Sequence, residues 1–517
     1  MPPKKLVARK VAAAIPKAGT KSVDPLKDTK AALKANSSSV KAEPVDDSVP
    51  RRENYSVVVD PASGRPLSVY LMWSDLKDNH NKYYVLQVLK TLGGTYYVWT
   101  RFGRVGAPGV TNFANMGDEA SAIKEFHKIE RAKKNKGYNE IKMSLGSSKN
   151  PEVEAEDESK KGPIEDSKLD KSLQSFVELI FNKKLMESSV SAAGYDIKKM
   201  PLGELSKDQA LKGVKILKQL EEVILGKAKG DILQLTSEFY TMIPHNFGMQ
   251  KMINFKIDTV DKVRDKMYLV NNLINIQDTY EMLKSGKKDK VNPKPQAKRP
   301  NPIDENFAKL AIKMQTIKAQ EAEYKFIEEY VQKGRGHQKL KIVDCFRVER
   351  PGEIRDFNPK KLDNKKLLWH GSRFSNFVGI LTQGLRIAPP EAPSTGYNFG
   401  KGVYFADMIE KSWWYAHPGL SGNVGIFVLA EVALGNPLKL QSSRTNTNAS
   451  NLPAGCHSTQ AMGSHEPDPC GNKTILGDVT IPLGKIVDTK NTWYTNEFIV
   501  YNTNQIRIRY IVRLTDR

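Results

Sequence analysis

The spacing of apolar residues changes along this chain, and each stretch is compatible with a different kind of fold. Between residues 55 and 101 apolar and polar residues alternate, which is the period of half-buried strands, and a Gly-Gly pair separates two of these runs like a hairpin turn. Residues 167–284 repeat apolar residues every three or four positions, the period of helices, and Ser206 and Gln209 have the spacing of a capping box. A chain with both patterns is predicted to be multidomain α+β.

Polar and charged segments separate these stretches. Residues 1–52 contain no aromatic residue and too few apolar ones to offset chain entropy, so we predict a disordered basic tail. Near the start of the last stretch a helix is expected over about 307–332, followed by short strands. The expected units are the tail over 1–52, a small β-rich domain over 53–144, a linker over 145–166, an all-α bundle over 167–287, a linker over 288–301 and a mixed α/β domain over 302–517.

Charge and cysteine content narrow the class of protein. The net charge is +22, which attracts polyanions, with nucleic acid as the first candidate. Three cysteines are too few for a disulfide framework and fit a reducing compartment. No apolar run is long enough to span a bilayer and the first residues lack the core of a secretory signal, so we expect an intracellular protein without a membrane partner. Cys456, His457, His465 and Cys470 lack the Cys-x-x-Cys spacing of a zinc site, and no metal is expected.

Three short motifs in the last third of the chain contain the candidate chemistry. They are Leu-Leu-Trp-His-Gly-Ser-Arg around His370, Gly-Lys-Gly-Val-Tyr-Phe-Ala around Tyr404 and Tyr-Thr-Asn-Glu-Phe-Ile-Val-Tyr around Glu497. Each places one polar side chain at the edge of an apolar strand, which suggests a cleft that binds a nucleotide. Neither a P-loop nor a Gly-x-Gly-x-x-Gly after a strand is present, which disfavours ATP hydrolysis and hydride transfer in a Rossmann domain.

These motifs, in this order, together with the segment from Leu381 to Pro393, resemble the ADP-ribosyltransferase domain of the DNA-dependent poly(ADP-ribose) polymerases. The resemblance implies NAD+ as the substrate and His370, Tyr404 and Glu497 as catalytic residues, with Lys411 tuning the charge of Glu497. Besides His370 and Tyr404, the residues that it places in the NAD+ cleft are Gly371, Ser372, Asn376, Arg386, Tyr397, Ser412 and Tyr415.

The expected reaction explains why one carboxylate is sufficient. Cleavage of the nicotinamide–ribose bond builds positive charge on the ribose, as in glycoside hydrolysis, but nicotinamide leaves as a neutral molecule and needs no acid. Glu497 would bind the ribose 2′-hydroxyl and stabilise the cationic transition state. By the same resemblance, the Gly371 backbone and the Ser412 hydroxyl would hold the carboxamide, and Tyr415 would stack on the nicotinamide ring.

The other two domains also resemble parts of this family. The β-rich domain is similar to the WGR module, with Phe102-Gly103-Arg104 in place of Trp-Gly-Arg. DNA ends would then be bound by Phe102 through stacking and by Arg104 and Arg101 through phosphates, with protein binding by this surface as the alternative. The helical region is similar to the regulatory domain, which implies an autoinhibitory lid over the NAD+ cleft that DNA loosens.

The function that this resemblance implies is the transfer of ADP-ribose from NAD+ to proteins in the nucleus, activated by DNA breaks, with elongation to polymer. The expected partners are DNA strand breaks with 5′-phosphorylated ends or nicks, acceptor proteins including the enzyme itself, and an accessory factor that completes the active site. The alternatives are a mono-ADP-ribosyltransferase, a DNA-end-binding scaffold with a silent catalytic domain, and an NAD+ sensor that performs no transfer.

Overall fold

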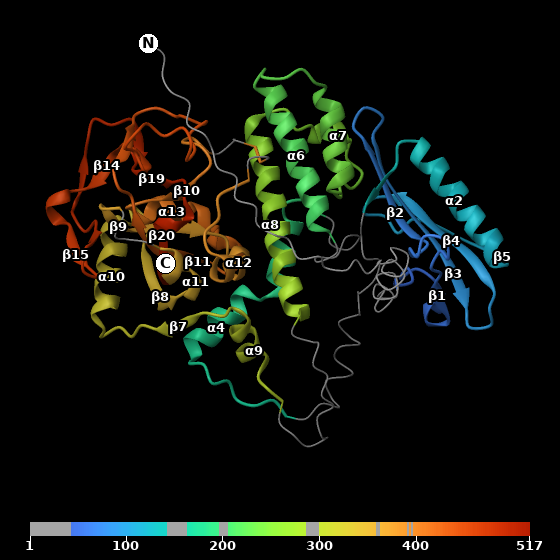
Figure 1. The fold of residues 1–517 in the computed structure, drawn as a ribbon, viewed down its shortest axis with the longest axis horizontal. Helices are drawn as coiled ribbons and strands as arrows, with labels where there is room; N and C mark the ends of the chain where they lie inside the picture. The colour runs from blue at the N-terminus through green and yellow to red at the C-terminus, as the bar shows by residue number, and fades with distance from the viewer. Residues whose placement is uncertain are drawn as a thin grey trace, which may run out of the picture. The chain divides into compact units, whose positions relative to one another are not determined.

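The computed structural model of this chain describes residues 43–141, 163–195, 205–285, 299–357, 362–389, 392–393 and 397–516. All of these belong to one compact unit of the chain, Glu43–Arg517. The predicted disorder of residues 1–42 and most of the two predicted linkers lie outside the described residues. Figure 1 shows two regions rich in strands and a group of long helices, which agrees with the predicted multidomain α+β class.

The first region is a six-stranded antiparallel sheet with the order β5-β4-β3-β2-β6, in which β1 also pairs with β3. Helix α2 covers one face of this sheet (Figure 1). On that face Ala122 and Phe126 of the helix belong to the same hydrophobic cluster as Leu86 and Val88 of β3. The alternation predicted from the sequence places these apolar side chains on that face. The elements are η1 (Arg52–Asn54), β1 (Tyr55–Val57), β2 (Ser68–Asp75), β3 (His80–Thr91), β4 (Tyr96–Arg104), β5 (Val110–Gly117), α2 (Glu119–Asn135) and β6 (Asn139–Ile141).

Residues 43–52 are ordered on the opposite face of this sheet, so the prediction that disorder extends to residue 52 is wrong for this segment. The backbone N–H of Asp46 donates to Gln87 Oε1 at 2.9 Å, and Gln87 Nε2 donates to the carbonyl oxygen of Pro44 at 2.9 Å. Val49 is buried in the core. A few specific contacts therefore order a segment whose average composition predicted disorder.

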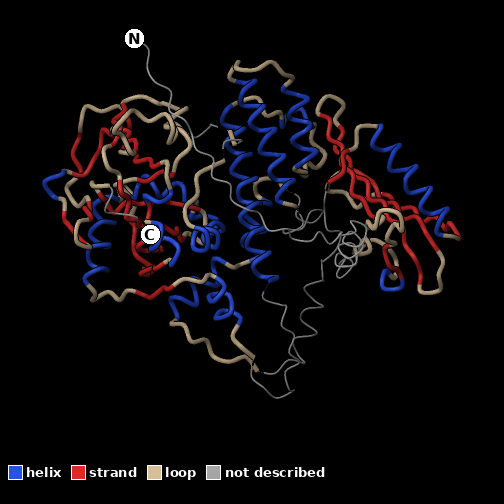
Figure 2. The backbone as a smooth tube through the Cα atoms, viewed as in Figure 1, coloured by secondary structure: helices blue, strands red, loops and turns tan. Residues whose placement is uncertain are grey.

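The second region is helical, as predicted, and Figure 2 shows its helices in blue beside the red strands of the first region. Ser206 is the N-cap of α6, and its hydroxyl accepts a hydrogen bond from Gln209 N. Helix α6 packs against both α7 and α8, but α4 packs on the C-terminal region, where the rings of Phe176 and Phe346 lie 5.2 Å apart. The elements are α4 (Lys171–Ile180), α5 (Lys183–Ser191), α6 (Lys207–Ile224), α7 (Ile232–Met242), η2 (Met252–Phe255) and α8 (Val260–Ser285).

The C-terminal region is built on three sheets with the strand orders β15-β16-β9-β11-β20-β8-β7, β10-β19-β13-β12 and β17-β14-β18. Its helices are α9 (Pro302–Lys309), α10 (Ala322–Gly334), α11 (Pro351–Asp356), η4 (Phe374–Asn376), α12 (Phe377–Gln383), α13 (Ile409–Ala416), η5 (Pro418–Ser421), η6 (Pro469–Gly471) and η7 (Thr503–Gln505). Its strands are β7 (Lys313–Thr316), β8 (Leu340–Glu349), β9 (Lys365–Ser372), β10 (Val403–Phe405), β11 (Val424–Ala433), β12 (Pro437–Leu440), β13 (Ser458–Ala461), β14 (Gly463–Pro467), β15 (Lys473–Ile475), β16 (Val479–Ile481), β17 (Ile486–Asp488), β18 (Trp493–Thr495), β19 (Glu497–Val500) and β20 (Ile506–Asp516).

The single helix predicted over 307–332 is wrong. Helix α9 ends at Lys309, Ala311 adopts a positive φ of 53°, and β7 pairs with β8 before α10 begins. Burial of Met314 and Ile317 against the sheet outweighs the local helical pattern.

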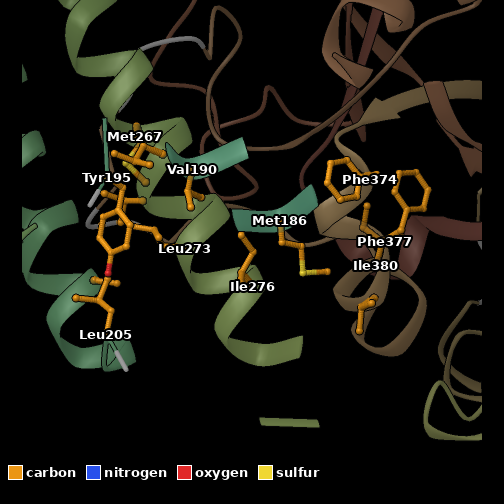
Figure 3. Packing of buried hydrophobic residues seen from close by; sticks show 14 of the residues in the cluster. Met186, Val190, Tyr195, Leu205, Met267, Leu273, Ile276, Phe374, Phe377 and Ile380 are labelled. Atoms are coloured by element: carbon orange, nitrogen blue, oxygen red, sulfur yellow. The ribbon is translucent and has the colours of Figure 1, made fainter. Parts of the chain in front are cut away.

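One hydrophobic cluster joins the helical region to the C-terminal region. Figure 3 shows Met186 and Ile276 of α5 and α8, with Phe374 and Phe377 from η4 and α12 in the same cluster. The long helix α8 is therefore packed directly on the region that contains the candidate chemistry. Among the helices that the structure describes, none combines the length and the apolar character needed to cross a membrane.

Candidate active site

Neighbouring strands place the three central residues of the motifs. Tyr404 lies on β10 and Glu497 on β19, and these two strands pair antiparallel. The strand β9, with His370, is joined to this pair by a two-bond bridge between Trp369 and Ala406, at 2.8 and 2.9 Å. Three segments that are far apart in sequence therefore meet at one point.

The imidazole of His370 is fixed by the backbone of the neighbouring strand. Its Nδ1 lies 2.8 Å from the carbonyl oxygen of Tyr404. Because a carbonyl oxygen only accepts, Nδ1 carries the proton and Nε2 is left as an acceptor. Burial lowers the pKa of His370, which favours this neutral form.

A cavity of about 560 Å³ lies around these residues and is lined by every residue that the sequence analysis placed in the NAD+ cleft. The Gly371 backbone is close to α13, because a Cβ at this position would lie 2.0 Å from the carbonyl oxygen of Ser412. A glycine here allows the helix to approach the strand. The residues from the sequence analysis that line the cavity are His370, Gly371, Ser372, Asn376, Arg386, Tyr397, Tyr404, Lys411, Ser412, Tyr415 and Glu497.

A close ion pair lies in the cavity wall. Lys411 Nζ is 2.6 Å from Glu497 Oε1, and Glu497 is 6% exposed. Burial by itself would lower the pKa of Lys411, but the nearby Glu497 carboxylate has the opposite effect, and the net shift is upward. An ammonium group therefore lies directly beside the Glu497 carboxylate in the cavity wall.

The phenol of Tyr404 is held by the loop that precedes it. Its hydroxyl donates to the carbonyl oxygen of Gly400 at 2.7 Å and accepts from Phe399 N at 3.0 Å. Tyr501 in turn donates to the carbonyl oxygen of Phe399 at 2.6 Å. Burial raises the pKa of Tyr404, so the phenol stays neutral and presents its ring to the cavity.

Helix α8 also lines the cavity, and sequence reasoning missed these residues. Asn275 Nδ2 donates to Asn376 Oδ1 at 2.8 Å, and Arg386 Nη2 donates to Asn275 Oδ1 at 2.9 Å. Asp278 Oδ2 lies 3.7 Å from Arg386 Nη1. The available signal was the set of asparagines, Asn271, Asn272 and Asn275, that interrupts the apolar stripe of this helix.

The three predicted DNA-binding residues differ in their surroundings. Phe102 is 38% exposed and stacks on Tyr84, with ring centroids 5.4 Å apart. Arg104 donates to the carbonyl oxygens of Gly248 at 2.9 Å and Gln250 at 3.2 Å, in the loop before η2.

Arg101 is placed differently from the sequence prediction. Its guanidinium pairs with the buried carboxylate of Asp46, with a shortest distance of 2.6 Å, and the Arg101 side chain is 12% exposed. The group is occupied within the domain and is not available to a phosphate in this arrangement. The partner, Asp46, comes from the segment that was predicted to be disordered.

Among the described residues, no three His, Cys, Asp or Glu side chains gather as the ligands of a metal ion would.

Comparison with known proteins identifies all three regions. Residues 321–516 match the poly(ADP-ribose) polymerase catalytic domain, residues 167–307 the poly(ADP-ribose) polymerase regulatory domain, and residues 67–144 the WGR domain. Poly [ADP-ribose] polymerase 2-A of Oryza sativa subsp. japonica is 36% identical over 469 residues, which cover 86% of this chain and 69% of the rice protein.

Two further relatives show the same similarity. Poly [ADP-ribose] polymerase 2 of Arabidopsis thaliana is 37% identical, over 85% of this chain and 72% of the plant protein. Poly [ADP-ribose] polymerase 1 of Gallus gallus is 35% identical over 87% of this chain, which spans 45% of the length of the chicken protein. The chain belongs to the poly(ADP-ribose) polymerase family of NAD+ ADP-ribosyltransferases and has WGR, regulatory and catalytic domains.

Proposed function

We propose that this protein transfers ADP-ribose from NAD+ to acceptor proteins, including itself, and extends it to poly(ADP-ribose), in the nucleus and in response to DNA breaks. The observation that supports this most directly is the Lys411–Glu497 pair in the wall of the cavity that His370 and Tyr404 also line. The names of the relatives support elongation to polymer, and the WGR domain supports DNA binding. DNA breaks with 5′-phosphorylated ends or nicks, acceptor proteins and an accessory factor that completes the site are the proposed partners.

Different residues of the cavity bind different parts of NAD+. The Gly371 backbone and the Ser412 hydroxyl hold the carboxamide, and Tyr415 and Tyr404 flank the nicotinamide ring. His370 accepts a hydrogen bond from the adenosine ribose through Nε2. The remaining residues that line the proposed NAD+ cleft are Ser372, Asn376, Arg386 and Tyr397.

Glu497 stabilises the reacting ribose. The bond between the ribose carbon and the nicotinamide nitrogen breaks, and its electron pair leaves with the neutral ring. The Glu497 carboxylate binds the 2′-hydroxyl and lowers the energy of the positive ribose. An acceptor oxygen then bonds to the same carbon and loses its proton, and a ribose hydroxyl of an existing ADP-ribose unit serves as the acceptor in elongation.

The contacts of α8 support a regulatory domain that keeps the enzyme inactive without DNA. Asn275 and Asp278 of α8 bind the side chains of Asn376 and Arg386. Because these two side chains are also proposed to bind NAD+, NAD+ competes with α8 for them. Arg104 of the WGR domain binds the loop before η2 in the same regulatory domain. DNA that takes Arg104 as a phosphate ligand releases this loop and favours an open regulatory domain, which is a population shift.

Automodification of the full chain with labelled NAD+, with and without 5′-phosphorylated nicked DNA, tests the proposal. A ladder of heavy products only with DNA is the expected result. A single discrete band with DNA would replace elongation by mono-ADP-ribosyl transfer. Full activity without DNA would contradict the regulatory part, and no label in either condition would contradict transfer by this chain alone.

A further inference from the structure

Behind Glu497, on the side away from the cavity, the amide of Asn496 is held between two carboxylates. Its Nδ2 donates to Asp407 Oδ2 at 2.8 Å and to Glu466 Oε2 at 3.0 Å. Its Oδ1 accepts from Gly463 N at 2.8 Å. Both N–H groups and the carbonyl oxygen of this amide are engaged, and Asn496 is 2% exposed.

We call this arrangement, in which Asp407, Glu466 and Gly463 bind the Asn496 side chain, the clamp. The clamp connects the segments that contain the catalytic residues. Asp407 follows Ala406, the residue that bridges to Trp369 beside His370, and it lies between Tyr404 and Lys411 in the chain. Glu466 and Gly463 lie on β14, and Asn496 lies between β18 and β19. One side chain therefore ties β14 to the two segments that present Tyr404, Lys411 and Glu497.

The two carboxylates of the clamp are an unfavourable choice if its purpose is only to stabilise the fold. Asp407 is 3% exposed, its Oδ1 has no hydrogen-bond partner among the described residues, and burial raises its pKa to about 6. The Glu466 carboxylate also acts to raise this pKa, while the nearby Lys366 ammonium and the Asn496 hydrogen bond act to lower it. Burying a carboxylate is costly unless it is well paired, so an apolar cluster here would be the simpler way to stabilise the fold.

We propose that Asn496, held by Asp407 and Glu466, is a positioning residue that sets the Glu497 carboxylate relative to Tyr404 and Lys411. This inference rests on the proposed role of Glu497. Neighbouring residues of an extended backbone point to opposite sides, so a backbone rotation at Asn496 swings Glu497 out of the cavity wall. Lys411 cannot prevent this by itself, because its long side chain is 30% exposed and follows the carboxylate.

The first test is Asn496→Leu in the full chain, assayed with 5′-phosphorylated nicked DNA. Leucine has a similarly branched but larger side chain and makes none of the three hydrogen bonds. The kcat of automodification falls about 100-fold, because displacement of a catalytic group by about 1 Å has an effect of this order. The KM for NAD+ stays within about twofold, because Asn496 does not line the cavity. Asn472→Leu, at an exposed asparagine before β15, is the matched control and retains wild-type kcat.

A second pair of variants keeps the inference testable if Asn496→Leu does not fold. Glu466 is only partly buried, so its replacement is better tolerated. Glu466→Leu removes one arm of the clamp and lowers kcat about tenfold with KM unchanged, a typical effect for a residue that acts through another. Glu466→Gln keeps an acceptor oxygen for Asn496 and loses less activity than Glu466→Leu.

The outcomes separate this inference from the proposed function. Glu497→Gln is measured in parallel, and wild-type elongation by it would remove the role on which the clamp depends. If Glu497→Gln is inactive while folded Asn496→Leu or Glu466→Leu retains wild-type kcat, the positioning role alone is wrong. The kcat of each variant is also measured below its thermal unfolding midpoint. If kcat is then equal to that of the wild type, the positioning role is wrong, because the loss at higher temperature reflects unfolding.

Discussion

Asn275, on helix α8 of the regulatory domain, donates a hydrogen bond to Asn376 of the catalytic domain at 2.8 Å, and the same asparagine accepts one from Arg386. Helix α8 therefore binds polar side chains that line the cavity itself.

Asn275→Ala is expected to raise activity in the absence of DNA. It removes two hydrogen bonds that hold α8 on the catalytic domain, which contribute about 1–2 kcal/mol together. Basal automodification without DNA rises about 5- to 30-fold, and activity at saturating DNA stays the same. Gln277→Ala, at a side chain that donates a hydrogen bond to Glu281 of the same helix, is the control. Equal basal rates in the two variants would contradict the competition between α8 and NAD+.

Lys411→Met is expected to lower kcat about 100-fold, because the Glu497 carboxylate loses its cationic partner in a buried wall. Lys411→Arg keeps the charge and retains more activity. Steady-state kinetics with labelled NAD+ compare the two variants. Equal losses in both would show that the shape of the lysine side chain, rather than its charge, is what the site requires.

The KM for NAD+ is expected to depend on pH through His370. Burial lowers the pKa of His370 below the ordinary value of about 6.5, so the ring is neutral at higher pH and Nε2 is an acceptor. The KM is then constant from about pH 8 to 6.5 and rises below this range as Nε2 takes a proton. A rise that begins above about pH 7 would show that the ring is protonated more easily than its burial implies.

Stability is expected to fall in acid because of His245 in the regulatory domain. Burial, together with the nearby Lys266, lowers the pKa of His245 well below its ordinary value, and Lys266 Nζ lies 2.9 Å from His245 Nε2. The unfolded chain takes up a proton at about pH 6.5 that the folded protein does not. The free energy of unfolding therefore decreases below this pH, by up to about 1.4 kcal/mol per pH unit.

Urea unfolding between about pH 5 and 7.5 measures this dependence. In His245→Gln the slope of the unfolding free energy against pH is shallower than in the wild type. An identical slope would assign the acid sensitivity to other groups.

Substitution of Arg104 is expected to weaken DNA binding with little effect on stability, whereas substitution of Arg101 is expected to lower stability. Arg104→Ala removes a half-exposed guanidinium proposed to bind a phosphate, so the affinity for 5′-phosphorylated nicked DNA falls about tenfold and thermal stability changes little. Fluorescence anisotropy with labelled DNA measures the affinity. Unchanged DNA binding would remove Arg104 from the interface.

Arg101→Ala is expected to have the opposite profile. It leaves the buried Asp46 carboxylate without its partner, which destabilises the WGR domain by about 3 kcal/mol. DNA affinity, measured at a temperature at which the variant is folded, stays near the wild-type value. A loss of affinity without a loss of stability would restore Arg101 as a DNA ligand.

Local patterns in the sequence were sufficient for several elements. The alternation over β3 and β4 predicted a two-faced sheet, and the spacing of Ser206 and Gln209 marked the start of α6. The motifs around His370, Tyr404 and Glu497 predicted three strand edges near one cleft, and all three side chains line one cavity. These features depend on neighbouring residues and on short motifs, which a sequence records directly.

Only the tertiary structure decided which partner each exposed or polar group meets. The pattern of α8 indicated a buried face but not that Asn275 would meet Asn376, 101 positions away. The composition of the first 52 residues predicted disorder, but Asp46 is ordered by Arg101, 55 positions away. The clamp on Asn496 depends on Asp407, 89 positions away. Periodicity shows which side of an element is buried, whereas hydrogen bonds and ion pairs between distant segments depend on how the chain returns on itself.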